Sequence, residues 1–132
     1  MPGLVRIWLT WFALVLFVSL PWIGFTSKPQ WHRVNWMPFH DPADRPRDAV
    51  LNGLLFVPLG FAVSRRCQPM KAVMLATVMA LSISIPAETT QLFSERRFPS
   101  ATDVLVAVMG AVTGAITTIS IRESSKPRTW TD

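Results

Sequence analysis

Four long runs of apolar residues, separated by short polar stretches, dominate the pattern of this chain. They extend over residues 4–25, 49–63, 70–86 and 102–121. Apolar runs of this kind, with few charges inside them, are typical of helices that cross a membrane. The pattern therefore predicts an all-α polytopic membrane protein, a bundle of four transmembrane helices.

The second run is short for a membrane span. Its 15 residues reach only ~22 Å as a helix, whereas the hydrocarbon core of a bilayer is ~30 Å thick. We therefore expect the helix to extend from Asp48 to Arg65. A locally thinned bilayer, or burial by neighbouring helices, would supply the remaining length.

The third run ends at Pro86, but proline is tolerated in membrane helices. We predict that this helix continues to about Phe93, which places Glu88 and Gln91 one turn apart on the same face. The fourth helix has Asp103 in its first turn, where the helix dipole favours a negative charge.

Around these helices the chain divides into four parts. Residues 1–25 form an N-terminal transmembrane helix, which we expect to be retained because its apolar run is longer than the core of a signal peptide. Residues 26–47 form an extracytoplasmic interfacial loop, whose tryptophans lie at the level of the lipid headgroups. Residues 48–121 form a three-helix core, and residues 122–132 form a short cytoplasmic tail.

Half of the 132 residues are hydrophobic and the mean hydropathy is +0.33, which is too apolar for an ordinary soluble domain of this size. The formal net charge is +5, but the basic residues lie in the stretches between the apolar runs, as is usual for membrane loops near anionic headgroups. The sequence has no basic stripe interleaved with aromatic residues, so we expect no nucleic-acid partner.

Metal and redox chemistry find little support in the sequence. Cys67 is the only cysteine, which excludes an intramolecular disulfide, and nothing near it forms a Cys/His pair. His32 and His40 share a loop with Asp41 and Asp44, but no metal-binding spacing links them. We interpret them as solvated loop residues and expect no metal and no cofactor.

The basic residues decide the orientation through their positions rather than their number. With four spans, seven of them fall on one side of the membrane and six on the other. The first group includes Arg65, Arg66, Lys71 and Arg122, which lie at helix ends in short segments, where positive charge has most influence on topology. We therefore predict that both termini are cytoplasmic.

Polar residues that are costly beside hydrocarbon lie at the ends of the apolar runs, in two blocks, residues 48–60 and residues 88–103. In the first block Asp48, Asn52, Phe56 and Gly60 share one stripe of a helix because they are four residues apart. In the predicted topology both blocks face outward at one depth. The candidate binding cluster consists of Asp48, Asn52, Glu88, Gln91, Arg97 and Asp103.

Three carboxylates and the planar fork of an arginine are able to form a single network. Two interpretations of the cluster stay open. It is either a ligand-binding site or an interhelical clamp without a ligand. Ionisable groups within a membrane usually mark functional sites, which favours the first interpretation. These groups lie near the interface, where the free-energy cost of a charge is lower, which favours the second.

The fourth helix carries a GxxxG pattern from Gly110 to Gly114, and Gly60 continues the stripe on the second helix. Small residues allow two helix backbones to approach closely. We expect Gly60, Gly110 and Gly114 to serve helix packing. Packing inside the bundle is favoured over a homo-oligomer formed through the Gly110/Gly114 face, because four helices must already pack together.

Taken together, these motifs resemble the VanZ-like family of small bacterial membrane proteins. The matching residues, in the family's order, are Asp48…Asn52-x-x-x-Phe56-x-Pro58-x-Gly60, Glu88-x-x-Gln91, Arg97-x-x-Ser100-x-x-Asp103-Val-Leu and Gly110-Ala-x-x-Gly114. The match covers about residues 48–115, within the three-helix core. One position departs from the pattern, because the family usually has an asparagine where this chain has Ala107. Either Asn52 makes the polar contact alone or the site is degenerate.

The resemblance implies a multi-helix protein of the bacterial inner membrane. The family takes its name from an accessory protein of glycopeptide resistance that is linked to teicoplanin. We expect a non-enzymatic cell-envelope factor whose outward cluster binds a lipid-linked precursor or another polar headgroup, with membrane lipids as partners and antibiotic resistance as a related role. The alternatives are a membrane enzyme on lipid-linked precursors, with Glu88 as acid or base, and a small proton-coupled transporter.

Overall fold

The computed structural model describes residues 2–19, 24–40 and 46–125. Within these residues the chain forms the α-helices α1 (Pro2–Ser19), α2 (Pro46–Ser64), α3 (Pro69–Gln91) and α4 (Ala101–Ser124), with a short 3-10 helix η1 (Trp31–Arg33). The described part is helical apart from two isolated β-bridges in its loops. By length and composition, α2, α3 and α4 are able to cross a membrane. These three apolar helices indicate a multi-pass membrane protein.

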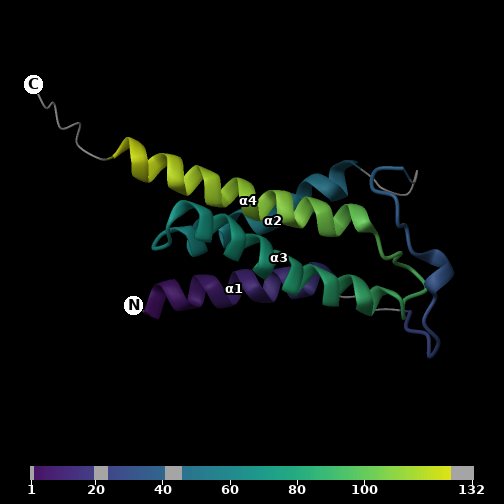
Figure 1. Ribbon diagram of the computed structural model, residues 1–132. Coiled ribbons are helices and arrows are strands. Elements are labelled where there is room, and N and C mark those ends of the chain that lie inside the picture. Colours follow the sequence, from purple (N-terminus) through teal and green to yellow (C-terminus); the bar gives the residue numbers. More distant parts are fainter. Residues whose placement is uncertain (1, 20–23, 41–45, 126–132) are drawn as a thin grey trace, which may run out of the picture.

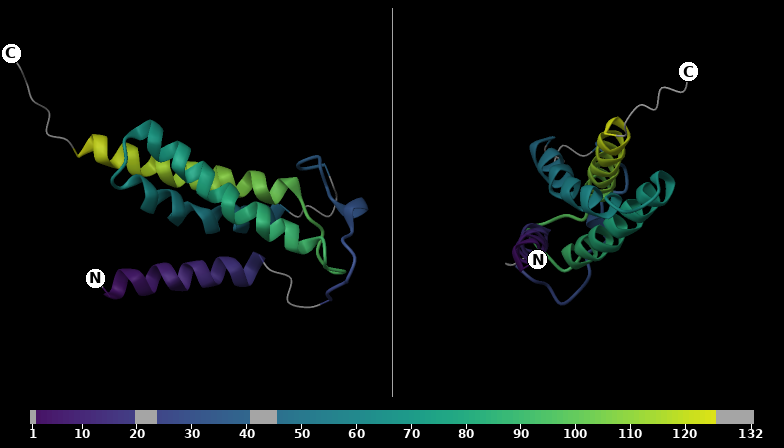
Figure 2. Two further views of the ribbon diagram at one scale, coloured as in Figure 1. Left: turned by 60° about the horizontal axis from the view of Figure 1, so that its bottom comes forward. Right: turned by 90° about the vertical axis from the view of Figure 1, so that its left-hand side faces the viewer.

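The four helices run alternately up and down the length of the molecule (Figure 1). The start of α1, the turn between α2 and α3 and the end of α4 lie at one end. The segments 24–40 and 92–100 lie at the other, which we call the loop end. Seen along the bundle, α4 and α1 lie on opposite sides of the α2 and α3 pair (Figure 2).

The helix boundaries follow local signals in the sequence. α3 begins at Pro69, which suits the first turn of a helix because proline needs no hydrogen-bond partner there. It continues through Pro86 to Gln91, which confirms the predicted extension. α1 is described as far as Ser19. It does not reach the predicted end at residue 25, because the backbone is in the left-handed region at Gly24 (φ +83°) and Phe25 pairs with Ser94.

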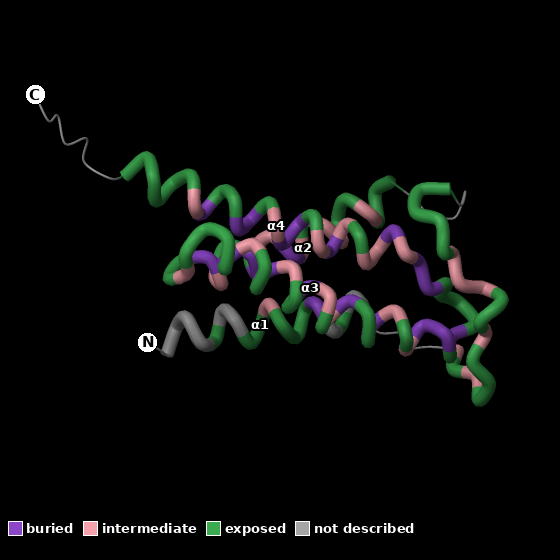
Figure 3. The backbone as a smooth tube through the Cα atoms, in the orientation of Figure 1, coloured by how far each residue is buried: buried purple, intermediate pink, exposed green. Residues whose placement is uncertain are grey.

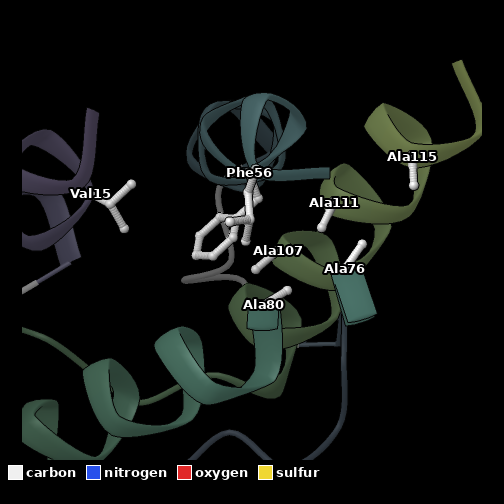
Figure 4. Packing of buried hydrophobic residues seen from close by; sticks show 8 residues of the cluster. Val15, Phe56, Ala76, Ala80, Ala107, Ala111 and Ala115 are labelled. Carbon is white, nitrogen blue, oxygen red and sulfur yellow. The ribbon is translucent and has the colours of Figure 1, made fainter. Parts of the chain in front are cut away.

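The core is built mainly from small side chains. On α3 the buried positions recur about every four residues, as one stripe of a helix does; they are Ala72, Ala76, Ala80, Ser84, Ala87 and Gln91. This stripe faces the buried alanines of α4 (Figure 3). Figure 4 shows the ring of Phe56 from α2 in the space between Val15 of α1 and the alanines of α3 and α4. Small residues on both sides let the helices lie close together.

The approach is closest between α2 and α4, where glycines face backbone atoms. A Cβ atom added at Gly60, Gly110 or Gly114 would lie 1.7, 1.9 or 2.1 Å from a carbonyl oxygen of the opposite helix. No side chain fits in such a space. Gly110 and Gly114 therefore pack inside the chain, against α2.

α1 is attached to this core through two inward-facing residues. The indole Nε1 of Trp11 donates a hydrogen bond of 2.7 Å to the carbonyl oxygen of Leu55, and Val15, one turn later, is fully buried. Leu55 lies next to the carbonyl of Leu54, which Pro58 leaves without its helical donor. Trp11 thus binds α2 one residue after the carbonyl that Pro58 leaves without its helical donor.

Candidate functional site

Glu88 joins α3 to the start of α4. Its Oε2 atom accepts a hydrogen bond of 2.8 Å from the backbone N–H of Ser100, and its Oε1 atom accepts one of 3.1 Å from Nε2 of Gln91. Gln91 is buried and Glu88 is half-buried. Each carboxylate oxygen of Glu88 therefore has a protein donor, and the predicted pair on one face of α3 forms a hydrogen-bonded unit.

Ser100 is the N-cap of α4, and its Oγ atom accepts a hydrogen bond of 3.1 Å from the N–H of Thr102. In a capping box, the residue three positions after the N-cap accepts the N-cap's own N–H. Here Glu88 of the neighbouring helix accepts it instead. A carboxylate at this position also meets the positive end of the α4 dipole. The Ser100-x-x-Asp103 spacing is the sequence signal that points to this cap.

Asn52 connects α2 to the same helix start. Its Nδ2 atom donates a hydrogen bond of 3.3 Å to the carbonyl oxygen of Asp103. Asp103 is half-buried in the first turn of α4, and its charge and that of Arg97 both act on Glu88. Four of the six predicted cluster residues, namely Asn52, Glu88, Gln91 and Asp103, therefore meet around the start of α4.

The other two, Asp48 and Arg97, are exposed. Asp48 lies in the first turn of α2. The backbone N–H of Arg97 donates to Oγ of Ser94 at 3.2 Å, while its guanidinium makes no hydrogen bond or ion pair to any part of the chain that the structure describes. Arg97 is thus a cation at the loop end that is available to a ligand.

The loop that carries Arg97 is held by backbone pairing with segment 24–40. The N–H of Asn35 donates to the carbonyl of Pro99, and the N–H of Ala101 donates to the carbonyl of Asn35, both at 2.9 Å. Three further backbone bonds join residues 24, 26 and 30 to residues 95, 93 and 92, in that order. The predicted interfacial loop is therefore a paired segment that covers the α3–α4 connection.

Arg33 strengthens this pairing. Its Nη2 atom donates to the carbonyl of Glu95 at 3.0 Å, and its guanidinium lies over the ring of Phe98, 3.9 Å from the centroid. Sequence reasoning missed Arg33 because its partners are about 60 positions away and no spacing rule connects them. Two arginines at the loop end, Arg33 in segment 24–40 and Arg97 in segment 92–100, thus have different surroundings: the guanidinium of Arg33 is bound, and that of Arg97 has no partner among the described residues.

A groove of about 640 Å³ lies between α3 and α4 and opens at the loop end. We call it the α3–α4 groove; it is lined by residues 77–92 on one side and 99–108 on the other, with Trp31 and Trp36 at the loop end. Glu88 and Ser100, which bond to each other, both contribute to its wall. The hydrogen-bonded cluster therefore forms the polar end of an apolar groove.

A family model described as VanZ/LLP1 matches residues 5–122. The chain belongs to the VanZ/LLP1 family. This match confirms the resemblance inferred from the polar motifs and extends it to α1, which those motifs did not include. No curated protein and no solved structure matches the chain.

The VanZ/LLP1 match makes position 107 informative. Ala107 is fully buried and belongs to the cluster around Phe56 and Ala111, one turn below Asp103. In this chain the position contributes to apolar packing, and the contact between α2 and the start of α4 is made by Asn52 with a backbone carbonyl. Asp41 and Asp44, which were considered with His32 and His40, lie outside the described residues.

Proposed function

We propose that this VanZ/LLP1 protein is a non-enzymatic factor of the cell envelope that binds the net anionic, phosphate-bearing headgroup of a membrane lipid or lipid-linked precursor at the loop end. The observation that carries this proposal is Arg97, an exposed cation without a partner in the described chain, on a loop whose backbone is fixed. A guanidinium recognises phosphate through two parallel hydrogen bonds, and a fixed backbone lowers the cost of ordering it.

The hydrogen bonds of Glu88 support binding over the enzymatic alternative. A general acid or base must reach the proton that it transfers. Both oxygens of Glu88 instead accept hydrogen bonds from Ser100 and Gln91. We assign Glu88 the role of positioning the start of α4 and the loop before it.

The position of the cluster also distinguishes binding from transport. Transporter sites usually lie near the bilayer midplane. Glu88 lies in the last turn of α3, and Ser100 caps the start of α4. A site at helix ends suits a headgroup at the membrane surface.

We place the loop end on the outer side of the bacterial inner membrane, with both termini in the cytoplasm. Arg65, Arg66 and Lys71, around the α2–α3 turn, and Arg122, near the end of α4, lie at the opposite end and favour the cytoplasmic side. A headgroup bound on the outer side belongs to the leaflet where envelope precursors and glycopeptides meet. The link of the family name to teicoplanin resistance agrees with this location.

The test compares Arg97→Ala with Arg96→Ala, its exposed neighbour on the same loop. The full-length protein is placed in nanodiscs of equal parts phosphatidylglycerol and phosphatidylcholine, and the lipids retained are counted by native mass spectrometry. We expect the wild-type protein and Arg96→Ala to retain phosphatidylglycerol preferentially. In Arg97→Ala the preference for phosphatidylglycerol should fall about tenfold, which is the effect of losing one or two charged hydrogen bonds. A folded Arg97→Ala protein with unchanged preference would contradict the proposal.

A further inference from the structure

The α3–α4 groove is an apolar feature that headgroup binding at Arg97 does not use. We propose that it receives a hydrocarbon chain of the lipid whose headgroup lies at Arg97, so that the ligand enters sideways from the outer leaflet. This inference rests on the proposed function and specifies its ligand as a chain-bearing lipid. It excludes a water-soluble headgroup as the whole ligand.

The lining of the groove is that of a hydrocarbon site with one polar end. Its side chains are apolar except for Thr77, Glu88, Thr89 and Ser100. Among the described residues that line it, Glu88 is the only ionisable one. Because Glu88 lies at the loop end of α3, charge is confined to one end, as in a lipid.

The part of the groove between its ionisable residue and its far end corresponds to one leaflet. Along α3 the wall extends from Leu92 back to Thr77, ~22 Å at a rise of 1.5 Å per residue, and the part from Glu88 back to Thr77 is ~16 Å. Half of a hydrocarbon core is ~15 Å. A chain whose headgroup lies at the loop end would therefore reach the bilayer midplane where the groove ends.

The mouth of the groove has the composition of a membrane interface. Trp31 and Trp36, which are 60% and 73% exposed, line it from segment 24–40. Tryptophan rings gather where headgroups meet hydrocarbon. Pro99 and Ser100 line the same end, directly after the loop that carries Arg97. The headgroup site and the groove are thus continuous.

A second groove on the other side of α4 serves as an internal comparison. It lies between α2 and α4, has a volume of about 500 Å³ and is also apolar. Among its described lining residues there is no ionisable group and no tryptophan. An annular lipid would occupy both grooves alike, whereas a specific lipid would prefer the one with the polar end.

The experiment uses the full-length protein in phosphatidylcholine nanodiscs with a trace of phosphatidylglycerol that carries a diazirine in the middle of one acyl chain. After illumination, the labelled peptides are identified by mass spectrometry. We expect labelling of the α3–α4 groove to exceed that of the α2–α4 groove at least fivefold. Leu105→Trp, which fills the first groove, should abolish this excess, and the matched Met109→Trp in the second groove should preserve it.

The outcomes separate the two proposals. Equal labelling of both grooves overturns the chain site, while a phosphatidylglycerol preference that depends on Arg97 would still support headgroup binding. If diazirine-bearing phosphatidylcholine labels the α3–α4 groove as selectively as phosphatidylglycerol does, that result retains the hydrocarbon-chain site in the groove and overturns the proposed headgroup binding. Dimers cross-linked through the α3–α4 groove, with little lipid label, assign the groove to a second copy of the chain and overturn the inference.

Discussion

The two partners of α4 hold it in different ways. Against α2 the contact is steric, because Gly60, Gly110 and Gly114 place backbone against backbone. Against α3 the decisive contact near the loop end is polar, because Glu88 accepts the N–H of Ser100 at 2.8 Å. A steric contact fails when atoms are added, whereas a polar contact fails when an acceptor is removed. An apolar groove lies on each side of α4, and on the α3 side the polar contact fixes the start of α4 in the wall of that groove.

The largest effect is expected from adding one methyl group to the steric contact. In Gly60→Ala the new Cβ atom would lie 1.7 Å from the carbonyl oxygen of Ala111, so two helix backbones must separate. Alanine is a better helix former by about 1 kcal/mol, but overpacking of this severity outweighs that gain. We expect a net loss of about 3 kcal/mol in the free energy of unfolding, measured by thermal denaturation in detergent.

Gly53→Ala is the matched control on the same helix. Its Cβ atom would lie 3.3 Å from the carbonyl oxygen of Val106, a distance that a small shift relieves. The gain in helix propensity then roughly offsets the contact, so stability should change little. Equal losses for both variants would show that close approach is not what holds α2 to α4.

An intermediate effect is expected from the polar contact. Glu88→Ala leaves the N–H of Ser100 and the amide of Gln91 without their acceptor, which costs about 2 kcal/mol at a half-buried position. Glu88→Gln keeps one acceptor oxygen and should lose less. Both are compared by thermal denaturation with Thr89→Ala, an exposed neighbour that bonds only within α3. If Glu88→Ala were as stable as Thr89→Ala, the polar contact would not hold α4.

The helices of this comparison could be predicted from the sequence because their signals are local. Apolar runs located α2, α3 and α4, and the tolerance of membrane helices for proline carried α3 through Pro86. The predicted end of α1 at residue 25 was wrong because the apolar run includes Gly24, whose backbone has a positive φ that a helix does not allow. The stripe of small residues on α3, at Ala72, Ala76 and Ala80, has the four-residue spacing of one helix face but was not predicted.

The candidate site was predictable only as a group of residues at one end of the bundle. Helical spacing placed Glu88 beside Gln91, and their hydrogen bond is present. Which residues are paired and which remain unpaired depends on bonds across the chain. Ser100 donates to Glu88, and backbone pairing with Asn35 holds the loop, whereas the guanidinium of Arg97 stays exposed without a partner among the described residues. Such contacts join residues that are far apart in the sequence, so they follow from the fold and cannot be predicted from the spacing of residues along the chain.

The smallest effect is expected at the far end of the steric contact, where α4 binds α2 through a side chain. The guanidinium of Arg122 donates to the carbonyl oxygens of Ser64 and Cys67, at 3.0 and 2.8 Å, and so caps the end of α2. Arg122→Met keeps the aliphatic stem but removes these bonds. Because Arg122 is exposed and water can replace it at the carbonyls, the loss should be about 1 kcal/mol.

Arg66→Met removes an exposed arginine beside the same helix end and is the control for the change in charge. It should leave thermal stability unchanged, and hydrogen exchange at the end of α2 should accelerate only in Arg122→Met. If Arg122→Met instead destabilised the protein as strongly as Gly60→Ala, side-chain bonds rather than backbone packing would dominate the contact between α2 and α4. The contrast between its two partners would then fail, since α4 would be held by polar groups on both sides.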